Sequence, residues 1–297
     1  MKKWLEAFRL RTLPLALASI GMGTFLAASR GYFQWNIFLW CALTTMLLQV
    51  LSNLANDYGD AVNGADGADR EGPLRSVQSG AIPQKDMLMA VILFACLSLF
   101  SGIMLLYVAF DGLSSSFWYF IGLGILAILA AVFYTAGRNP YGYAGFGDLS
   151  VLLFFGLIAV MGSSYLYEQQ WVYSQLLPAL SVGLFSVGVL NVNNIRDIKS
   201  DLKAGKMSIP ARLGRKKAIK YHMWLIGGGV LCALIFSLIT TQNYGHLIFL
   251  LSLPMFIKNI RAVHQIKEAQ LLDPYLKQLA LSTLAFVMLF GLGGIFI

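Results

Sequence analysis

Two polar segments, residues 56–80 and 193–214, interrupt a chain that is otherwise strongly apolar. Carboxylates beside a lipid bilayer are costly to maintain and usually mark a functional site. A divalent cation that holds a phosphorylated ligand would explain why acids and basic residues gather in both segments. The acids, together with the amides at which the segments open, are Asn56, Asp57, Asp60, Asp66, Asp69, Asn193, Asp197 and Asp201.

The spacing of these side chains places several of them on shared helix faces. Asn193, Asp197 and Asp201 recur at every fourth residue, so in a helix they would drift only about 80° around the axis. Asn56 and Asp60 have the same spacing. Each segment is therefore predicted to present at least two oxygen ligands on one helix face.

Beyond Asp60 the first segment is expected to leave the helix, because four glycines between positions 59 and 72 disfavour it. Asp66 and Asp69 are then predicted to lie on a loop. Oxygen donors without imidazole or thiolate suit Mg²⁺ or Ca²⁺, and Mg²⁺ binds through few carboxylates plus substrate phosphate. Two such clusters facing each other would hold Mg²⁺ ions that bridge a diphosphate. The alternative is that these acids are ordinary solvated loop charges.

The composition predicts an integral membrane protein. Of the 297 residues, 58% are hydrophobic and 12% are charged, whereas soluble domains carry about 25% charged residues. Nine apolar stretches are long enough to cross roughly 30 Å of hydrocarbon as helices, so the expected fold is an all-α bundle of nine transmembrane helices. The predicted spans are residues 12–29, 35–56, 87–110, 116–136, 147–167, 175–195, 222–241, 244–260 and 274–296.

The distribution of basic residues predicts the orientation of the bundle. With nine spans, 21 of the 22 lysines and arginines fall on the side of the N-terminus, and only Arg30 falls opposite. The positive-inside rule makes that side cytoplasmic, so the N-terminus and both acidic segments of this multi-pass cell-membrane protein should face the cytoplasm. Basic residues dispersed among membrane loops argue against nucleic-acid binding. The N-terminal apolar run is interpreted as a first span rather than a cleaved signal peptide.

At these residues the chain resembles the UbiA superfamily of intramembrane aromatic prenyltransferases. That superfamily is identified by an NDxxD-type motif after span 2 and a DxxxD motif after span 6, in a bundle of nine helices. Here the motifs are residues 56–60 and 197–201, and the resemblance covers residues 1–297 as a single domain. The third acid that many members carry is replaced here by Gly64, and the next acid is Asp66.

Within the superfamily, the sequence is most similar to the branch that acts on 1,4-dihydroxy-2-naphthoate in menaquinone biosynthesis. The similarity is carried by residues 56–80, 134–149 and 193–214, two of which open the predicted acid-rich loops at about 56–86 and 193–221. It implies transfer of a polyprenyl group from polyprenyl diphosphate to the naphthoate, with loss of CO₂ and diphosphate, giving demethylmenaquinol. Another aromatic acceptor, such as 4-hydroxybenzoate or homogentisate, is the main alternative. An ion-coupled transporter is a weaker one, because its acids would lie near the bilayer midplane.

The resemblance also implies a role for each candidate site residue. Two Mg²⁺ ions on the prenyl diphosphate would be held by Asp57, Asp60, Asp66, Asp197 and Asp201. Diphosphate oxygens would be contacted by Asn56, Arg70, Arg75, Arg138, Asn193, Lys206 and Arg212. The catalytic residues would be Asp60, Asp197, Lys206 and Tyr134, with the Tyr134 ring stabilising a carbocation or orienting the acceptor. Tyr141 and Tyr143 are interpreted instead as interfacial aromatic residues.

Overall fold

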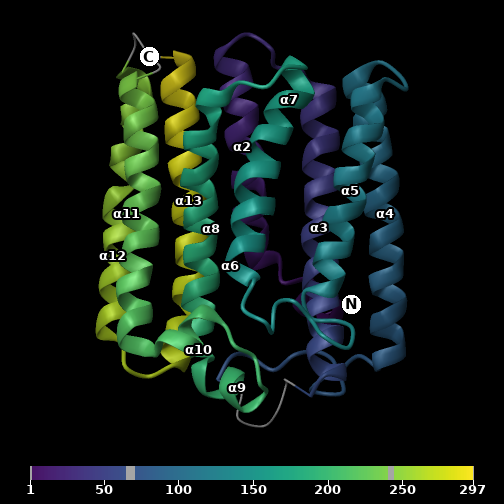
Figure 1. The fold of residues 1–297 in the computed structure, drawn as a ribbon, viewed down its shortest axis with the longest axis vertical. Coiled ribbons are helices and arrows are strands. Elements are labelled where there is room, and N and C mark those ends of the chain that lie inside the picture. Colours follow the sequence, from purple (N-terminus) through teal and green to yellow (C-terminus); the bar gives the residue numbers. More distant parts are fainter. Residues whose placement is uncertain (1, 65–70, 240–243, 297) are drawn as a thin grey trace.

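The computed structural model describes residues 2–64, 71–239 and 244–296. Within these ranges helices are the only regular elements, and nine helical rods are long and apolar enough to cross a membrane. Figure 1 shows the rods running side by side along the long axis of the molecule. The prediction of an all-α bundle with nine spans is therefore confirmed for the part of the chain that the structure describes, whereas the orientation of the bundle stays a prediction.

The rods are built from the following elements in chain order. The first five spans contain α1 (Lys2–Phe8) with η1 (Leu10–Thr12) and α2 (Leu13–Ser29), then α3 (Trp35–Val62), α4 (Gln84–Phe110), α5 (Ser115–Phe133), and a continuous rod of α6 (Gly147–Val151), the π-helical η2 (Leu152–Met161) and α7 (Gly162–Glu168). The last four contain η3 (Tyr173–Gln175) with α8 (Leu176–Arg196), α11 (Arg215–Ile239), η4 (Tyr244–Ser252) with α12 (Leu253–Gln265), and η5 (Gln270–Leu272) with α13 (Asp273–Phe296). Two short helices, α9 (Ile198–Lys203) and α10 (Ile209–Leu213), lie outside the spans between α8 and α11.

Both acidic motifs lie at the same end of the bundle, as an even number of spans between them requires. The motifs occupy the last turns of α3 and the junction of α8 with α9, and α9 and α10 cover this end at the bottom of Figure 1. The C-terminus lies at the opposite end. We call the end that carries the motifs, α9 and α10 the site end.

Two helices extend further than the apolar stretches alone predict. α3 continues past residue 56 to Val62, so the whole first motif is helical and the predicted loop begins only after it. Gly59 is tolerated there because the chain after α5 packs directly against it: a Cβ atom at Gly59 would lie 2.6 Å from the carbonyl carbon of Thr135. α11 likewise begins at Arg215, inside the loop predicted to reach residue 221.

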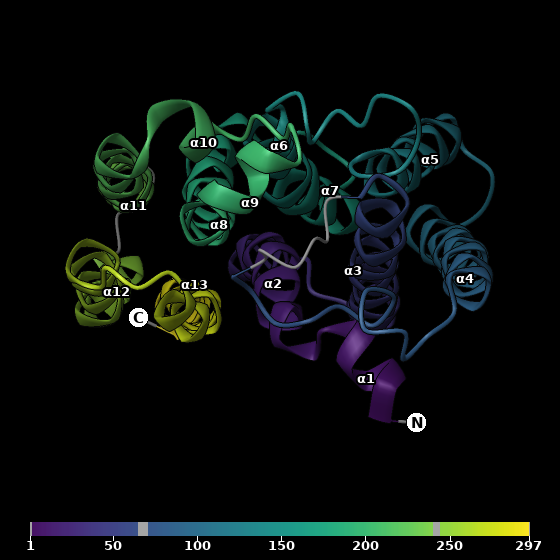
Figure 2. The ribbon, with the colours of Figure 1, turned by 90° about the horizontal axis from the view of Figure 1, so that it is seen from below.

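The C-terminal half of the bundle forms a closely packed support for the second motif. Figure 2 shows α11, α12 and α13 on one side of α2, and α3, α4 and α5 on the other. Between α8, α12 and α13 the ring of Phe185 lies 4.5 Å from that of Phe256 and 5.1 Å from that of Phe286, centroid to centroid, and all three are buried. Burying aromatic rings contributes strongly to packing, so the middle of α8 is packed firmly against α12 and α13.

Candidate active site

The first motif places Asn56 and Asp60 one turn apart at the site end of α3. The buried Asp60 carboxylate accepts a hydrogen bond of 2.6 Å from the Tyr143 hydroxyl and forms an ion pair with Arg75. The Arg75 guanidinium also donates to the main-chain oxygen of Asn56, whose side-chain oxygen accepts from the Thr135 hydroxyl at 3.2 Å. Arg75, predicted to contact phosphate, therefore lies directly against the first motif.

The second motif is held by Arg196, which is not among the site residues predicted from the sequence. Its Nε and Nη2 atoms donate to the two oxygens of Asp197 at 2.8 and 2.7 Å, and Nη2 also donates to Asn193 at 2.8 Å. Its Nη1 donates to Asp273 at 2.5 Å, and Asp273 accepts from Arg11 at 2.6 Å. The Arg196 side chain is 1% exposed. These ion pairs tie the end of span 6 to the beginnings of spans 9 and 1.

Asp201 lies one turn beyond Asp197, on α9. Its main-chain N–H donates to the Asp197 oxygen at 2.8 Å, so the helical path continues across the junction of α8 and α9. Its carboxylate accepts from the Ser208 hydroxyl at 2.9 Å and lies 3.6 Å from Nζ of Lys206. Burial raises the pKa of Asp201, and Lys206 and Ser208 offset only part of that shift. The ionised form of Asp201 therefore benefits from a cation close by.

Tyr143, in the chain segment after α5, joins the two motifs. Its hydroxyl donates to Asp60 of the first motif, and Nζ of Lys206, the ion-pair partner of Asp201 in the second motif, lies 5.9 Å from the centre of its ring. Its main-chain oxygen accepts from the Met207 N–H at 2.8 Å. The structure corrects the interpretation of Tyr143 as an interfacial residue. The signal that could have marked it is its position within the 134–149 stretch, which the resemblance had already singled out.

Tyr134 follows α5 directly and lies beside the first motif. Its ring centroid is 5.4 Å from that of Tyr141, edge to face, and Gly142 packs against it so closely that a Cβ atom there would lie 2.5 Å from the Tyr134 main-chain oxygen. Burial, followed by the nearby charges of Asp148 and Asp60, raises the pKa of the Tyr134 hydroxyl. That hydroxyl therefore stays protonated, and the ring offers an uncharged aromatic surface.

Two predicted phosphate ligands are exposed at the site end. Arg212 is exposed, and its guanidinium donates to the main-chain oxygens of Met207 at 2.9 Å and Ala144 at 2.6 Å, so it links two loops. Arg138 is exposed on the segment after α5. Three further residues lie outside the described residues, and the predictions for them stay open: Asp66, Asp69 and Arg70.

Asp57 has partners of a different kind from those of the other predicted metal ligands. Its side-chain oxygens accept hydrogen bonds from the main-chain N–H groups of Ser76 and Val77, at 3.1 and 3.3 Å. The residue is 1% exposed. Its carboxylate is therefore committed to the backbone of the loop that follows α3.

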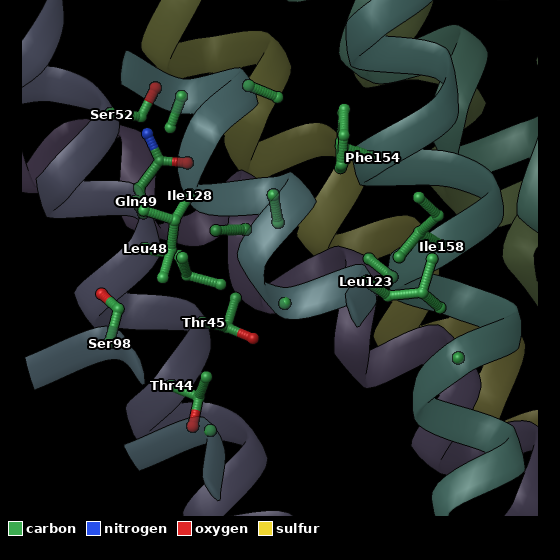
Figure 3. A pocket seen from close by; sticks show the side chains of 18 of the residues that line it. Thr44, Thr45, Leu48, Gln49, Ser52, Ser98, Leu123, Ile128, Phe154 and Ile158 are labelled. Atoms are coloured by element: carbon green, nitrogen blue, oxygen red, sulfur yellow. The ribbon is translucent and has the colours of Figure 1, made fainter. Parts of the chain in front are cut away.

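An apolar cavity of about 380 Å³ extends from the first motif into the bundle, enclosed by α2, α3, α4, α5 and the rod from α6 to α7. Along α3 its lining runs from Cys41 to Asn56, which is roughly 22 Å of helix at 1.5 Å per residue. Figure 3 shows Gln49 of α3 facing Phe154 across the cavity. Asn56 and Tyr134 line its site end. Charged side chains at one end of a long apolar cavity suit an amphipathic ligand with an anionic head.

The donors at the site fit magnesium by their chemistry. Asp60, Asp197 and Asp201 supply only oxygen, and each forms an ion pair with a basic side chain. Among the residues that the structure describes, no three acidic, imidazole or thiol side chains gather closely enough to hold an ion by themselves. Mg²⁺ commonly takes one or two carboxylates and completes its shell with substrate phosphate and water. A diphosphate would therefore supply the missing ligands.

Comparison with known proteins identifies similar sequences over nearly the whole chain. Residues 15–294 match the model of the UbiA prenyltransferase family. The 1,4-dihydroxy-2-naphthoate octaprenyltransferase of Haemophilus influenzae is 44% identical, with 99% of this chain and 96% of that protein aligned. The protein of the same name from Escherichia coli is also 44% identical, over 98% of this chain and 94% of its own length.

Solved structures of more distant proteins share the fold. A UbiA homologue from Aeropyrum pernix superposes with a TM-score of 0.68 at 19% identity, covering 94% of this chain and 96% of that one. A UbiA homologue from Archaeoglobus fulgidus, solved with DMAPP and Mg²⁺, also gives a TM-score of 0.68, at 14% identity, covering 97% and 99%. At these identities the likeness establishes the common helical architecture.

Proposed function

Because the chain belongs to the UbiA prenyltransferase family, we propose that it transfers a polyprenyl group from polyprenyl diphosphate to 1,4-dihydroxy-2-naphthoate, releasing diphosphate and CO₂. The product is demethylmenaquinol, an intermediate of menaquinone biosynthesis. The observation that carries the proposal is 44% identity to two proteins of this activity over nearly full length. The geometry supports it, since two acidic motifs joined by Tyr143 lie at one end of an apolar cavity.

The anionic head of the donor binds at the site end in this proposal. Asp60, Asp197 and Asp201 hold Mg²⁺, which we expect as two ions bridging the diphosphate. When bound, magnesium supplies positive charge that stabilises the departing diphosphate. Arg75 and Lys206 lie against the same carboxylates, so they are placed to turn from carboxylate to phosphate when the donor enters.

The allylic end of the donor meets aromatic surface at the mouth of the cavity. Tyr134 lines this region, and its neutral ring stabilises positive charge on the allylic carbon as the bond to diphosphate breaks. The acceptor ring attacks that carbon through the ring carbon that bears the carboxylate, forming the new carbon–carbon bond. The ionised carboxylate then leaves as CO₂, and its electron pair restores the aromatic ring.

The isoprenoid tail lies in the apolar cavity along α3 in this proposal. Most of the lining is apolar and comes from helices that face α3, for example Leu106, Leu123 and Phe154, whereas α3 itself contributes several polar side chains, among them Thr45 and Gln49. An extended apolar cavity excludes water from the reacting carbon, which protects a carbocation from hydrolysis. The same arrangement lets the tail remain in hydrocarbon while its head reaches the charged site end.

We further propose that the site end faces the cytoplasm of the cell membrane, because the site end carries most of the basic residues. Lys199 is exposed on α9 and suits a labelling test. A Lys199→Cys variant should react with a membrane-impermeant maleimide in inverted vesicles but not in sealed right-side-out vesicles. The reverse pattern would invert the orientation.

The acceptor assignment is tested by product analysis. Purified protein with Mg²⁺ and a prenyl diphosphate is offered 1,4-dihydroxy-2-naphthoate, 4-hydroxybenzoate and homogentisate together, and products are identified by mass. Prenylated naphthoquinol with release of CO₂ is expected. Turnover with 4-hydroxybenzoate or homogentisate, and none with the naphthoate, would replace the proposed acceptor. Omitting Mg²⁺ should stop the reaction, and full activity in a chelator would refute the metal dependence.

A further inference from the structure

Asp57 lies on a different side of α3 from the two motif residues that flank it. At about 100° per residue it is turned roughly 100° from Asn56 and 60° from Asp60 around the helix axis. Asn56 lines the cavity, whereas Asp57 does not. Instead Asp57 faces the segment that leads from the first motif to α4, where Ser76 and Val77 donate their main-chain N–H groups to it.

The segment that Asp57 contacts is a compact turn. The Ser79 N–H donates to the Arg75 oxygen at 2.9 Å, and the Ile82 N–H donates to the Ser76 oxygen at 3.0 Å. Val77 packs against a buried cluster that includes residues of α1 and α3, and Ile82 belongs to that cluster. The first N–H groups of such a turn have no partner inside it, so a carboxylate that accepts them acts as a cap.

The turn carries Arg75, and Arg75 returns to the motif. Its guanidinium pairs with Asp60 and donates to the main-chain oxygen of Asn56. Asp57 on α3 therefore anchors the turn through the turn's backbone. The turn in its place positions the Arg75 side chain against Asn56 and Asp60 of the same helix. Loss of the cap would release the backbone on the C-terminal side of Arg75.

We propose that Asp57 is a positioning residue that anchors the 75–80 turn, and so places Arg75 for the diphosphate, rather than a ligand of the metal. The difference from Asp60 lies in the partners. Asp60 is held by a guanidinium and a hydroxyl, which can swing aside when a cation arrives. Asp57 accepts hydrogen bonds from two backbone N–H groups, and these bonds break only if the turn itself unfolds. The proposal rests on the proposed role of Arg75 in diphosphate binding.

Two substitutions of Asp57, one mild and one severe, distinguish a residue that anchors the turn from a ligand of the metal. Asp57→Asn keeps one acceptor oxygen, and asparagine caps about as well as aspartate; Asp57→Ala keeps none. For an anchor, the KM for prenyl diphosphate should rise a few-fold in Asp57→Asn and about 10–100-fold in Asp57→Ala. The Mg²⁺ concentration for half-maximal rate should stay at the wild-type value. A metal ligand would instead shift that Mg²⁺ concentration in both variants, and such a shift with an unchanged KM would overturn the proposal.

Coupling to Arg75 is the second arm of the experiment. If Asp57 acts through Arg75, adding Asp57→Ala to Arg75→Gln should raise the KM little beyond Arg75→Gln alone. If the KM of the double variant rises by the product of the two single fold-changes, the two residues act separately, and the positioning role is refuted. Asp60→Asn serves as the matched control, since it removes a proposed metal ligand four residues away and should abolish turnover.

A readout without substrate keeps the proposal testable if the proposed reaction fails. The Arg75 side chain is 10% exposed, so trypsin should cleave the folded wild-type protein slowly at this position. Cleavage after Arg75 should become faster in Asp57→Asn and fastest in Asp57→Ala, with other sites unchanged. Equal cleavage in all three proteins would refute the anchor, whether or not the naphthoate is the acceptor. Asp57→Asn alone decides the outcome if Asp57→Ala does not reach the membrane.

Discussion

Arg196 allows a direct test of how the site end is held together, because one buried guanidinium forms ion pairs with two carboxylates. Arg196→Met retains much of the side-chain volume and removes the charge that Asp197 and Asp273 share. Removing one partner of a buried ion pair destabilises a protein by about 3–5 kcal/mol. Arg11 still pairs with Asp273 in this variant. We therefore expect the free energy of unfolding to fall by an amount at the lower end of that range, about 3 kcal/mol.

This loss can be measured as a change in thermal stability. For a chain of this size, each kcal/mol corresponds to roughly 2–4 °C in Tm, so the expected decrease for Arg196→Met is about 6–12 °C. Unfolding of the purified protein in detergent, followed by tryptophan fluorescence, would report it. Because the substitution frees Asp197 to pair with another cation, added Mg²⁺ should raise the Tm of Arg196→Met more than that of the wild type.

The matched control is Arg138→Met, which removes an arginine from the same end of the bundle. Arg138 is exposed, and surface substitutions of this kind usually change stability by less than about 0.5 kcal/mol. Its Tm should therefore stay within about 2 °C of wild type. Equal losses in the two variants, or a loss below about 2 °C for Arg196→Met, would refute the view that Arg196 holds the second motif.

Three further predictions concern the carboxylates and Tyr143. Asp60→Ala and Asp197→Ala should each abolish product formation, measured by mass spectrometry, without preventing membrane insertion; wild-type activity in either variant would remove the proposed metal role from that residue. Tyr143→Phe removes a charge-assisted hydrogen bond to Asp60, worth about 1.5–3 kcal/mol, and should lower kcat/KM by roughly 10–150-fold. Tyr173→Phe, at a residue 82% exposed at the opposite end, should leave kcat/KM unchanged, and equal values for the two variants would contradict the role of Tyr143. Because burial raises the pKa of Asp201, its contribution to folding stability is present below the ordinary carboxyl range and is lost as pH rises through the raised value. Asp201→Asn should flatten that part of the dependence of Tm on pH, and an unchanged dependence would show that Asp201 is not its source.

The bundle could be predicted because a membrane constrains every span in the same way. Each crossing needs a long apolar stretch, and the basic loops alternate with the crossings, so nine spans follow from composition along the chain. Helical spacing was equally informative at the second motif. The Asp197 N–H donates to the Asn193 oxygen at 3.1 Å, and the Asp201 N–H donates to the Asp197 oxygen at 2.8 Å, as two successive steps of four residues require.

The contacts that hold the site could not be predicted, because their partners are far apart in the sequence. Arg196 and Asp273 are separated by 77 residues, and Tyr143 and Asp60 by 83. No periodicity links such pairs, and a count of charges treats Arg196 like any loop arginine. The apolar span predicted for α3 ends at residue 56 because charged residues follow, whereas the helical spacing of Asn56 and Asp60 extends the helix to within one turn of its end at Val62. At Gly59 the contact with the segment after α5 leaves no room for a side chain.

The pairing of charges at the site end also bears on the order in which ligands can bind. Each proposed metal ligand already has a basic partner: Asp60 with Arg75, Asp197 with Arg196, and Asp201 with Lys206. Among the described residues these six charges cancel, so the site alone attracts neither a cation nor a diphosphate strongly. A metal that arrives with a diphosphate changes this balance, because the carboxylates can turn to the metal while Arg75 and Lys206 turn to the phosphates. Arg196 remains tied to Asp273 throughout. The arrangement therefore favours joint binding of metal and donor over binding of either alone.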